Sequence, residues 1–313
     1  MSGPRRMVKA FAPATVANVA AGFDVLGFAV ADPGDTVEAH RTAGGVTVRE
    51  ITGDGGRLPR DDSNTAVIAV RALLERLGGP LRGGLALHKG LPMASGLGGS
   101  AASAAAALIA VNRLAGDALP PEELLPCALA AERVAAGAGH ADNAAPALMG
   151  GFVLIRSSDP PDLIRLPVPA GLAVALLSPE VEIRTEVARR ILPTQIPLTQ
   201  AVSQWGNLAA LVASMHSGDL ALMGRSLCDV VAEPVRASLI PGFDRVKEAA
   251  LAGGAIGCSI SGSGPAVFAL VATAVQAAIV GEAMKGAFAA VGLEAVSYVS
   301  EIGTSGPRVL AES

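Results

Sequence analysis

Aromatic residues are scarce in this chain of 313 residues, which has one Trp, one Tyr and seven Phe. Alanine and glycine are abundant instead, so we expect a core of Ala, Leu, Val and Ile with many close backbone contacts. Lys and Arg are spread thinly and the net charge is -4, so the dense basic surface that nucleic acid requires is missing. The composition argues against nucleic acid as a partner.

Cysteine pairs and long hydrophobic runs are also missing. Cys127, Cys228 and Cys258 are far apart and have no CxxC spacing, which argues against a zinc site or a redox pair and favours a reducing compartment. A proline and two polar residues interrupt the N-terminal apolar stretch that a signal peptide needs. The longest apolar stretch, residues 266–281, is short for a membrane span and contains a glutamine. We therefore expect a cytoplasmic protein without a membrane segment.

The spacing of apolar residues predicts an α+β fold, because strands and helices are mixed along the chain. The Pro-rich segment 157–171 marks the expected boundary between two domains, residues 1–163 and residues 164–313. A loop is predicted over residues 137–151. Strands are predicted over residues 8–12, 28–30, 35–39, 46–51, 84–89, 152–155, 172–177, 255–259, 266–271 and 294–299, and helices over 64–78, 100–114, 120–136, 201–216, 220–231, 243–252 and 273–291, with another from Thr185.

The segment LPMASGLGGSAASAAAALIAVNRL, residues 91–114, is the most informative part of the sequence. A glycine-rich turn leads directly into a helix at Ser100, so backbone N–H groups converge where the helix N-terminus adds partial positive charge. Such a turn is typical of a phosphate site. It lacks the GK[ST] ending of a Walker A loop, and the chain lacks the motifs of a protein kinase.

Two other interpretations of this turn stay open from its residues alone. Gly96, Gly98 and Ala101 satisfy the dinucleotide fingerprint G-x-G-x-x-A, and Asp117 follows at roughly the expected distance of about 20 residues. Against this, residues 91–95 separate the preceding strand from the first glycine, and Asp117 lies in a turn. The second interpretation is a packing turn that binds no ligand.

Three segments together resemble the motifs of the GHMP kinases, a group of small-molecule kinases. The first runs from Pro13 to Gly27, the second from Pro92 to Ala102, and the third from Ser261 to Ala266, in the family's order. One departure is Gly99, which stands where the family commonly has a serine; the second serine of the loop is present as Ser100.

The resemblance implies both a fold and a co-substrate. It implies an N-terminal domain like domain 2 of ribosomal protein S5 and a ferredoxin-like C-terminal domain, with the active site between them. It also implies ATP as the phosphoryl donor and Mg²⁺ as the cation. The expected ATP-binding residues are Asn64, Pro92, Met93, Ala94, Ser95, Gly96, Leu97, Gly98, Gly99, Ser100, Ala101, Ala102, Gly262, Ser263 and Gly264.

Ser100 and Glu132 are the expected Mg²⁺ ligands. Ser100 is the first residue of its helix, and Glu132 lies in an otherwise apolar helical stretch, where an unpaired carboxylate is costly. A hard cation with few protein ligands suits Mg²⁺. The resemblance implies that both residues bind the metal and take part in catalysis. The alternative for Glu132 is a position on a solvated helix face or in a structural ion pair.

Three further segments, residues 139–151, 185–193 and 234–242, narrow the resemblance to the homoserine kinase branch, which implies L-homoserine as the substrate in threonine biosynthesis. A zwitterion needs an arginine for its carboxylate and an acidic or carbonyl group for its ammonium. The resemblance places Asn143 at the attacking hydroxyl, and no residue is an obvious general base, with Asp142 a candidate by type. The expected substrate-binding residues are Asn18, Asp24, His140, Asp142, Thr185, Arg189 and Arg236.

Two alternative functions remain. One is another GHMP kinase, acting on a mevalonate-type or sugar substrate, and the segments that carry the substrate residues argue against it. The other is a non-catalytic protein of the same fold that senses a metabolite, and the presence of Ser100 and Glu132 argues against that. A homodimer is compatible with the sequence.

Overall fold

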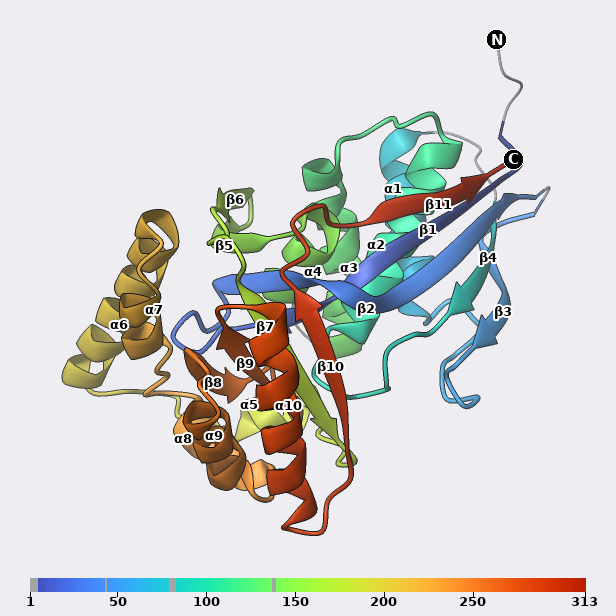
Figure 1. Cartoon of the computed structure of the whole chain (residues 1–313). Coiled ribbons are helices and arrows are strands. Elements are labelled where there is room, and N and C mark those ends of the chain that lie inside the picture. The colour runs from blue at the N-terminus through green and yellow to red at the C-terminus, as the bar shows by residue number, and fades with distance from the viewer. Residues whose placement is uncertain (1–4, 43, 79–82, 137–138) are drawn as a thin grey trace.

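Two β-sheets form the centre of the protein in the computed structural model, which describes residues 5–42, 44–78, 83–136 and 139–313 (Figure 1). The first sheet has seven strands, and the second has four. The first contains β1 (Met7–Ala17), β2 (Leu26–Arg41), β3 (Thr47–Thr52), β4 (Gly83–His88), β5 (Phe152–Ser158), β6 (Pro161–Leu166) and β11 (Arg308–Glu312), and the second contains β7 (Ala173–Pro179), β8 (Gly257–Ile260), β9 (Val267–Val271) and β10 (Ala295–Glu301).

Helices pack on the outer face of each sheet. One hydrophobic core joins the first sheet to α1 (Thr65–Leu77), α2 (Gly99–Leu114), α3 (Leu125–Ala136) and α4 (Ala141–Met149), with a short 3₁₀ turn at Pro121–Leu124. Another joins the second sheet to α9 (Phe243–Ala252) and α10 (Ala274–Ala289). In the described part of the chain, no helix is long and apolar enough to cross a membrane. Between β7 and α9 lie α5 (Thr185–Arg190), α6 (Leu198–Ser217), α7 (Leu220–Ser226), α8 (Glu233–Arg236) and a 3₁₀ turn at Ala237–Leu239.

Strand β7 is apolar along its whole length because it faces two cores. Val174 and Leu176 pack into a core shared with the first sheet, whereas Ala173, Ala175 and Leu177 pack against α9 and α10. Strand β9 alternates in the same way. Burial on both faces explains why these strands read as continuous apolar runs in the sequence.

The order of strands in the second sheet confirms the expected ferredoxin-like topology. The order is β10-β7-β9-β8, every neighbouring pair is antiparallel, and helices separate β7 from β8 and β9 from β10. This is the split β-α-β arrangement repeated once. The division after residue 163 stays a prediction; β6 spans it, and β11 returns from the C-terminal half to pair with β1 in the first sheet.

The predicted loop over residues 137–151 is wrong, because α4 occupies most of it. Gly, Asn and Pro146 indicated a loop, but eight of the nine residues of α4 are buried against the first sheet and its helices. Tertiary packing therefore overrides a weak local propensity, even with Pro146 inside the helix. Residues 137 and 138 lie outside the described part of the chain.

Two other predictions miss local detail. The helix predicted over residues 220–231 ends at Ser226, because Asp229 accepts backbone N–H groups from residues 231–233 and starts a new helix there. Strands β6 and β11 were not predicted. Both are edge strands with exposed residues, so their sequences lack the alternation that marks a strand with one buried face.

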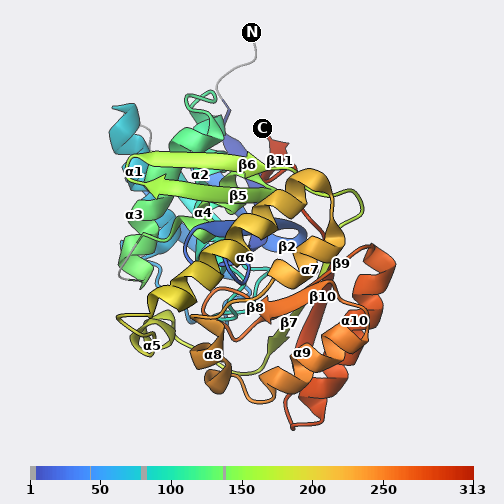
Figure 2. The ribbon, with the colours of Figure 1, turned by 90° about the vertical axis from the view of Figure 1, so that its left-hand side faces the viewer.

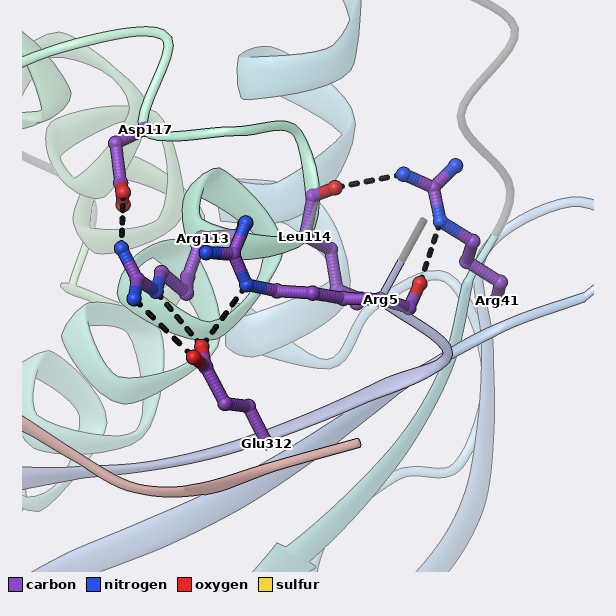
Figure 3. Close-up of polar contacts among 6 residues, drawn as sticks. All are labelled: Arg5, Arg41, Arg113, Leu114, Asp117 and Glu312. Atoms are coloured by element: carbon purple, nitrogen blue, oxygen red, sulfur yellow. Dashed lines mark hydrogen bonds and ion pairs between the residues drawn. The ribbon is translucent and has the colours of Figure 1, made fainter. Parts of the chain in front are cut away.

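The C-terminal strand is also tied by side chains, which Figure 3 shows. The Glu312 carboxylate accepts hydrogen bonds from Nε of Arg5 and of Arg113, at 2.9 and 2.8 Å. Arg41 donates to the carbonyls of Arg5 and Leu114, the latter at the C-terminal end of α2. These groups are partly exposed, so the pairing of β11 with β1 contributes more to stability than the ion pairs do.

Deleting residues 308–313 should therefore lower the free energy of unfolding by about 2–4 kcal/mol, because the edge of β1 loses its ladder of backbone hydrogen bonds. Glu312→Gln keeps the strand and should leave the unfolding midpoint close to that of the parent. Urea unfolding followed by circular dichroism measures both. Equal losses in the two variants would show that the ion pairs hold the C-terminus.

Candidate active site

A cavity of about 330 Å³ collects residues from both halves of the chain. Four of the residues expected from the sequence do not line this cavity. Leu97, Ala101 and Ala102 are buried in the hydrophobic cores. Asp24 lies next to the cavity and is hydrogen-bonded to Arg189, which does line it. The expected residues that line the cavity are Asn18, Asn64, Pro92, Met93, Ala94, Ser95, Gly96, Gly98, Gly99, Ser100, Glu132, His140, Asp142, Asn143, Thr185, Arg189, Arg236, Gly262, Ser263 and Gly264.

The turn before α2 is held from two sides by distant segments. On one side, Ser261 Oγ donates a hydrogen bond to the Gly96 carbonyl at 2.7 Å. On the other, the Thr15 N–H donates to the Leu97 carbonyl at 3.1 Å. The third glycine-rich segment and β1 therefore both contact the turn.

Gly96 and Gly98 are required by backbone conformation and by packing. Their φ angles are 79° and 68°, in the left-handed region that favours glycine. A Cβ on Gly98 would lie 2.0 Å from Thr15 Oγ1, and one on Gly96 would lie 2.7 Å from a backbone carbonyl oxygen. Gly99 differs, because the nearest atom to its Cβ would be Lys89 Nζ at 3.5 Å. The position where the family commonly has a serine therefore has room for one.

The first turn of α2 offers uncapped N–H groups to an anion. Its N-cap is Gly98, which has no side chain to accept a hydrogen bond, so these N–H groups have no partner in the helix. The Ser95 hydroxyl is buried and has no partner among the described residues. Both features fit a phosphate group bound at the helix N-terminus.

Ser100 and Glu132 are in direct contact. Ser100 Oγ donates to Glu132 Oε1 at 2.6 Å, and Glu132 is 6% exposed. Burial raises the pKa of Glu132, and the hydrogen bond from Ser100 opposes this shift. Over the residues that the structure describes, Glu132 has no ion pair, and no group of three or more His, Cys, Asp or Glu side chains could hold a metal. Two hard oxygen donors fit Mg²⁺ when phosphate and water complete its shell.

Arg189, Asp24 and His140 form a connected polar group. Arg189 donates to both carboxylate oxygens of Asp24, at 2.7 and 3.1 Å, and its Nη2 lies 3.0 Å from Nδ1 of His140. Burial, and then the positive charge of Arg189, lowers the pKa of His140, so a neutral imidazole accepts this bond. Arg189 Nε and His140 Nε2 are buried without a partner in the described chain, which indicates a ligand.

Asp142 is a buried carboxyl next to this group. It is 2% exposed, and its Oδ1 has no hydrogen-bond partner among the residues described. Burial, followed by the negative charge of Asp24, raises the pKa of Asp142 to about 7. A cationic group entering the cavity would stabilise the ionised form of this carboxyl.

Arg236 is a buried cation, 3% exposed, and so is not a surface charge. Its Nε donates to the Ala188 carbonyl and its Nη1 to the Gly262 carbonyl, at 3.2 and 2.9 Å. The guanidinium groups of Arg189 and Arg236 both lie over the ring of Phe23, 5.6 and 5.2 Å from its centroid. Phe23 is thus in contact with both arginines.

Asn18 and Asn64 use their amides to hold backbone. Asn18 Nδ2 donates to the Gly262 carbonyl at 2.9 Å, and its Oδ1 accepts the Asp24 N–H at 3.0 Å. Asn64 caps α1 by accepting the Ala66 N–H, and its Nδ2 donates to a backbone carbonyl. Direct contact of either amide with a ligand stays a prediction.

Two residues outside the predicted set, Lys89 and Thr15, also belong to the site. Lys89 is ion-paired with Asp35, and its Nζ donates to the Gly99 carbonyl at 2.9 Å. Thr15 Oγ1 donates to Asn143 Oδ1 at 2.7 Å, which leaves the Asn143 amino group for a ligand. In the sequence, these two residues could have been recognised as a lysine just before the glycine turn and a threonine inside the first motif.

The chain is similar to known kinases over almost its whole length. Residues 64–151 match the family described as GHMP kinases N terminal domain, and residues 208–290 match GHMP kinases C terminal. A homoserine kinase from Chlorobium phaeovibrioides is 52% identical over 97% of this chain and 100% of its own length.

Solved structures agree with these matches. The crystal structure of a homoserine kinase from Cytophaga hutchinsonii has a TM-score of 0.96 at 50% identity and covers 99% of each chain. A mevalonate kinase from L. major shares the fold, with a TM-score of 0.73 at 16% identity over 96% of this chain and 99% of its own. The chain therefore belongs to the GHMP kinase family, in its homoserine kinase branch.

Proposed function

We propose that this chain transfers the γ-phosphoryl group of ATP to the side-chain hydroxyl of L-homoserine and releases O-phospho-L-homoserine, ADP and a proton. The observation that carries the proposal is one cavity that joins an uncapped helix N-terminus to a buried group of arginine and acidic side chains. The first part fits a polyphosphate, and the second fits a zwitterion. Relatives named homoserine kinase support the same substrate.

The ATP phosphates would lie against the turn before α2 and the first turn of that helix. There the backbone N–H groups and the buried Ser95 hydroxyl supply hydrogen bonds. Ser100 and Glu132 would hold Mg²⁺, which when bound neutralises charge on the phosphates. Lys89, ion-paired with Asp35, would hold the turn by its hydrogen bond to the Gly99 carbonyl.

The amino-acid end of L-homoserine would bind between the arginines and the acidic residues. Arg189 and Arg236 fit its carboxylate, and Asp24 with Asp142 fits its ammonium group. Without a ligand, Arg189 and Asp24 neutralise each other. The carboxylate of a zwitterion would pair with Arg189 and its ammonium with Asp24. The Arg189–Asp24 pair is then replaced by two pairs, and neither residue is left without a partner.

Catalysis is assigned to positioning and charge stabilisation, which phosphoryl transfer requires more than covalent help. Thr15 binds the amide oxygen of Asn143, so the amino group of Asn143 is oriented for the attacking hydroxyl. Because Gly98 has no side chain, the phosphate turn lies directly against this pair. The hydroxyl and the phosphoryl group are thereby held side by side.

Incubating the protein with ATP, Mg²⁺ and a panel of L-homoserine, L-serine, L-threonine and mevalonate tests the proposal. Mevalonate has a carboxylate but no ammonium, so it would leave Asp24 and Asp142 without a cationic partner. We expect phosphorylation of L-homoserine to dominate. Preferential phosphorylation of mevalonate, or no transfer to any acceptor despite bound nucleotide, would overturn the assignment in favour of another kinase or a sensor.

Ser100→Ala and Glu132→Gln should each lower turnover by at least about tenfold, and activity should require a divalent cation, because both residues act on charge that develops between the phosphates. Gly99→Ser is the matched control on the same turn, and should stay near the parent since a side chain fits there. Steady-state assays across Mg²⁺ concentrations measure this. Near-normal turnover of either variant at saturating Mg²⁺ would contradict its role.

Arg189→Ala and Arg236→Ala should each raise the KM for homoserine while leaving the KM for ATP nearly unchanged. A lost charge-assisted bond is expected to cost about 2–4 kcal/mol, or roughly 30-fold to 1000-fold in kcat/KM. The methyl ester of homoserine should be a poor substrate for the parent, but the variants should lose comparatively little on esterification. If esterification lowers kcat/KM equally in the parent and in the variants, these arginines do not bind the carboxylate.

Asp142→Asn should remove a pH dependence of stability in the ligand-free protein. The pKa of Asp142 rises from 3.8 to about 7 on folding, so the folded form keeps a proton that the unfolded chain releases between these values. The free energy of unfolding of the parent should therefore fall as pH rises from about 4 to about 7, then level off. Urea unfolding at several pH values should give a flatter curve for the variant; parallel curves would contradict the assignment.

A further inference from the structure

We propose that Gln204 on α6 is a positioning residue that sets the distance between the ammonium-binding and carboxylate-binding parts of the site; this rests on the function proposed above. Gln204 is 8% exposed and does not line the cavity. Helix α6 lies beside the turn between β1 and β2 in Figure 1, and Figure 2 shows it passing in front of that turn.

The amide of Gln204 makes three hydrogen bonds to two segments of the site. Its Nε2 donates to the Ala21 carbonyl at 3.2 Å and to Asp229 Oδ1 at 3.0 Å. Its Oε1 accepts the Val230 N–H at 2.9 Å. One side chain therefore joins the β1–β2 turn, which carries Asp24, to the segment that starts α8 and carries Arg236.

The β1–β2 turn needs outside support because its backbone is strained. Asn18, Val19 and Ala20 have φ angles of 68°, 46° and 58°, and a β-branched residue in this region is a genuine outlier. Such conformations persist only where the surroundings hold them. The bond to the Ala21 carbonyl holds the chain between these residues and Asp24.

The α8 segment has the same need, because α8 has four residues and cannot be stable alone. The carboxylate of Asp229 accepts the N–H groups of residues 231–233, at 2.8 to 3.0 Å, and so starts the helix that positions Arg236. Gln204 in turn binds Asp229 itself. Both hydrogen-bonding ends of the amide are thus used to hold the α8 segment.

The two segments also meet on the cavity side, where Asn18 Nδ2 and Arg236 Nη1 both donate to the Gly262 carbonyl. Gly262 and Gln204 therefore link the same two segments at two points. An α-amino acid carries its ammonium and carboxylate at a fixed separation, so the spacing that these links maintain selects for that class of substrate. Losing Gln204 should loosen recognition of the amino acid without touching the phosphate turn.

The test compares Gln204→Met with the parent enzyme. Methionine has a similar length but lacks both polar groups. We expect the KM for homoserine to rise by about tenfold or more, with the KM for ATP within about twofold, since three hydrogen bonds to the homoserine side of the site are lost. Ser214→Ala is the matched control on the same helix, because Ser214 is fully buried and, among the described residues, its hydroxyl donates only to the Leu211 carbonyl within α6. It should change neither KM.

A double-mutant cycle separates positioning from a general loss of stability. If Gln204 acts through Arg236, then Arg236→Ala should raise the homoserine KM less in the Gln204→Met background than in the parent. The proposal would be overturned if the two substitutions multiply each other's effect on the homoserine KM. It would also be overturned if Gln204→Met raises both KM values in parallel, or lowers the melting temperature and leaves the homoserine KM unchanged.

Three further outcomes are also decisive. If Gln204→Met does not fold, Gln204→Glu keeps the acceptor for the Val230 N–H but loses the donor to Ala21 and Asp229, and an unchanged homoserine KM in that variant overturns the inference. A parent enzyme that does not phosphorylate homoserine overturns the proposed function and this inference together. An active parent with an unaffected Gln204→Met variant overturns the inference alone.

Discussion

The turn before α2 is held in a conformation that only contacts from both halves of the chain can maintain. Gly96 and Gly98 have positive φ, and the atoms of Thr15 and Ser261 approach the turn where side chains would collide. The free N–H groups of α2 converge on the cavity only while this packing holds. The second sheet therefore supports the phosphate site directly, because Ser261, in the segment between β8 and β9, bonds to the turn.

The site combines this rigid turn with ionisable groups that folding leaves incompletely partnered. Asp142 Oδ1, Arg189 Nε and His140 Nε2 are buried without partners in the described residues, although most buried polar groups in proteins are hydrogen-bonded. Burying such groups lowers stability. The extensive cores of Ala, Leu and Val on both sheets offset that cost, and a zwitterionic ligand supplies the missing partners.

Much of the fold could be predicted from the sequence because its signals are local. The Ala-rich helix after the glycine turn, the apolar runs of β7 and β9, and the ends of α1 follow from side-chain periodicity and capping. Helix α4 was missed for the opposite reason. Its local sequence, with Pro146, favours a loop, and only burial against β1, β2 and β5 makes it helical.

By itself, the sequence determined which residues could do the chemistry: the glycines of the turn, Ser100 with Glu132, and the acidic and arginine side chains of the substrate segments. Only the tertiary structure decided their partners. Arg189 pairs with Asp24 across 165 residues, and Gln204 reaches Ala21 across 183. Spacing along the chain carries no signal for contacts between segments so far apart, because they exist only after two sheets have packed and brought those segments together.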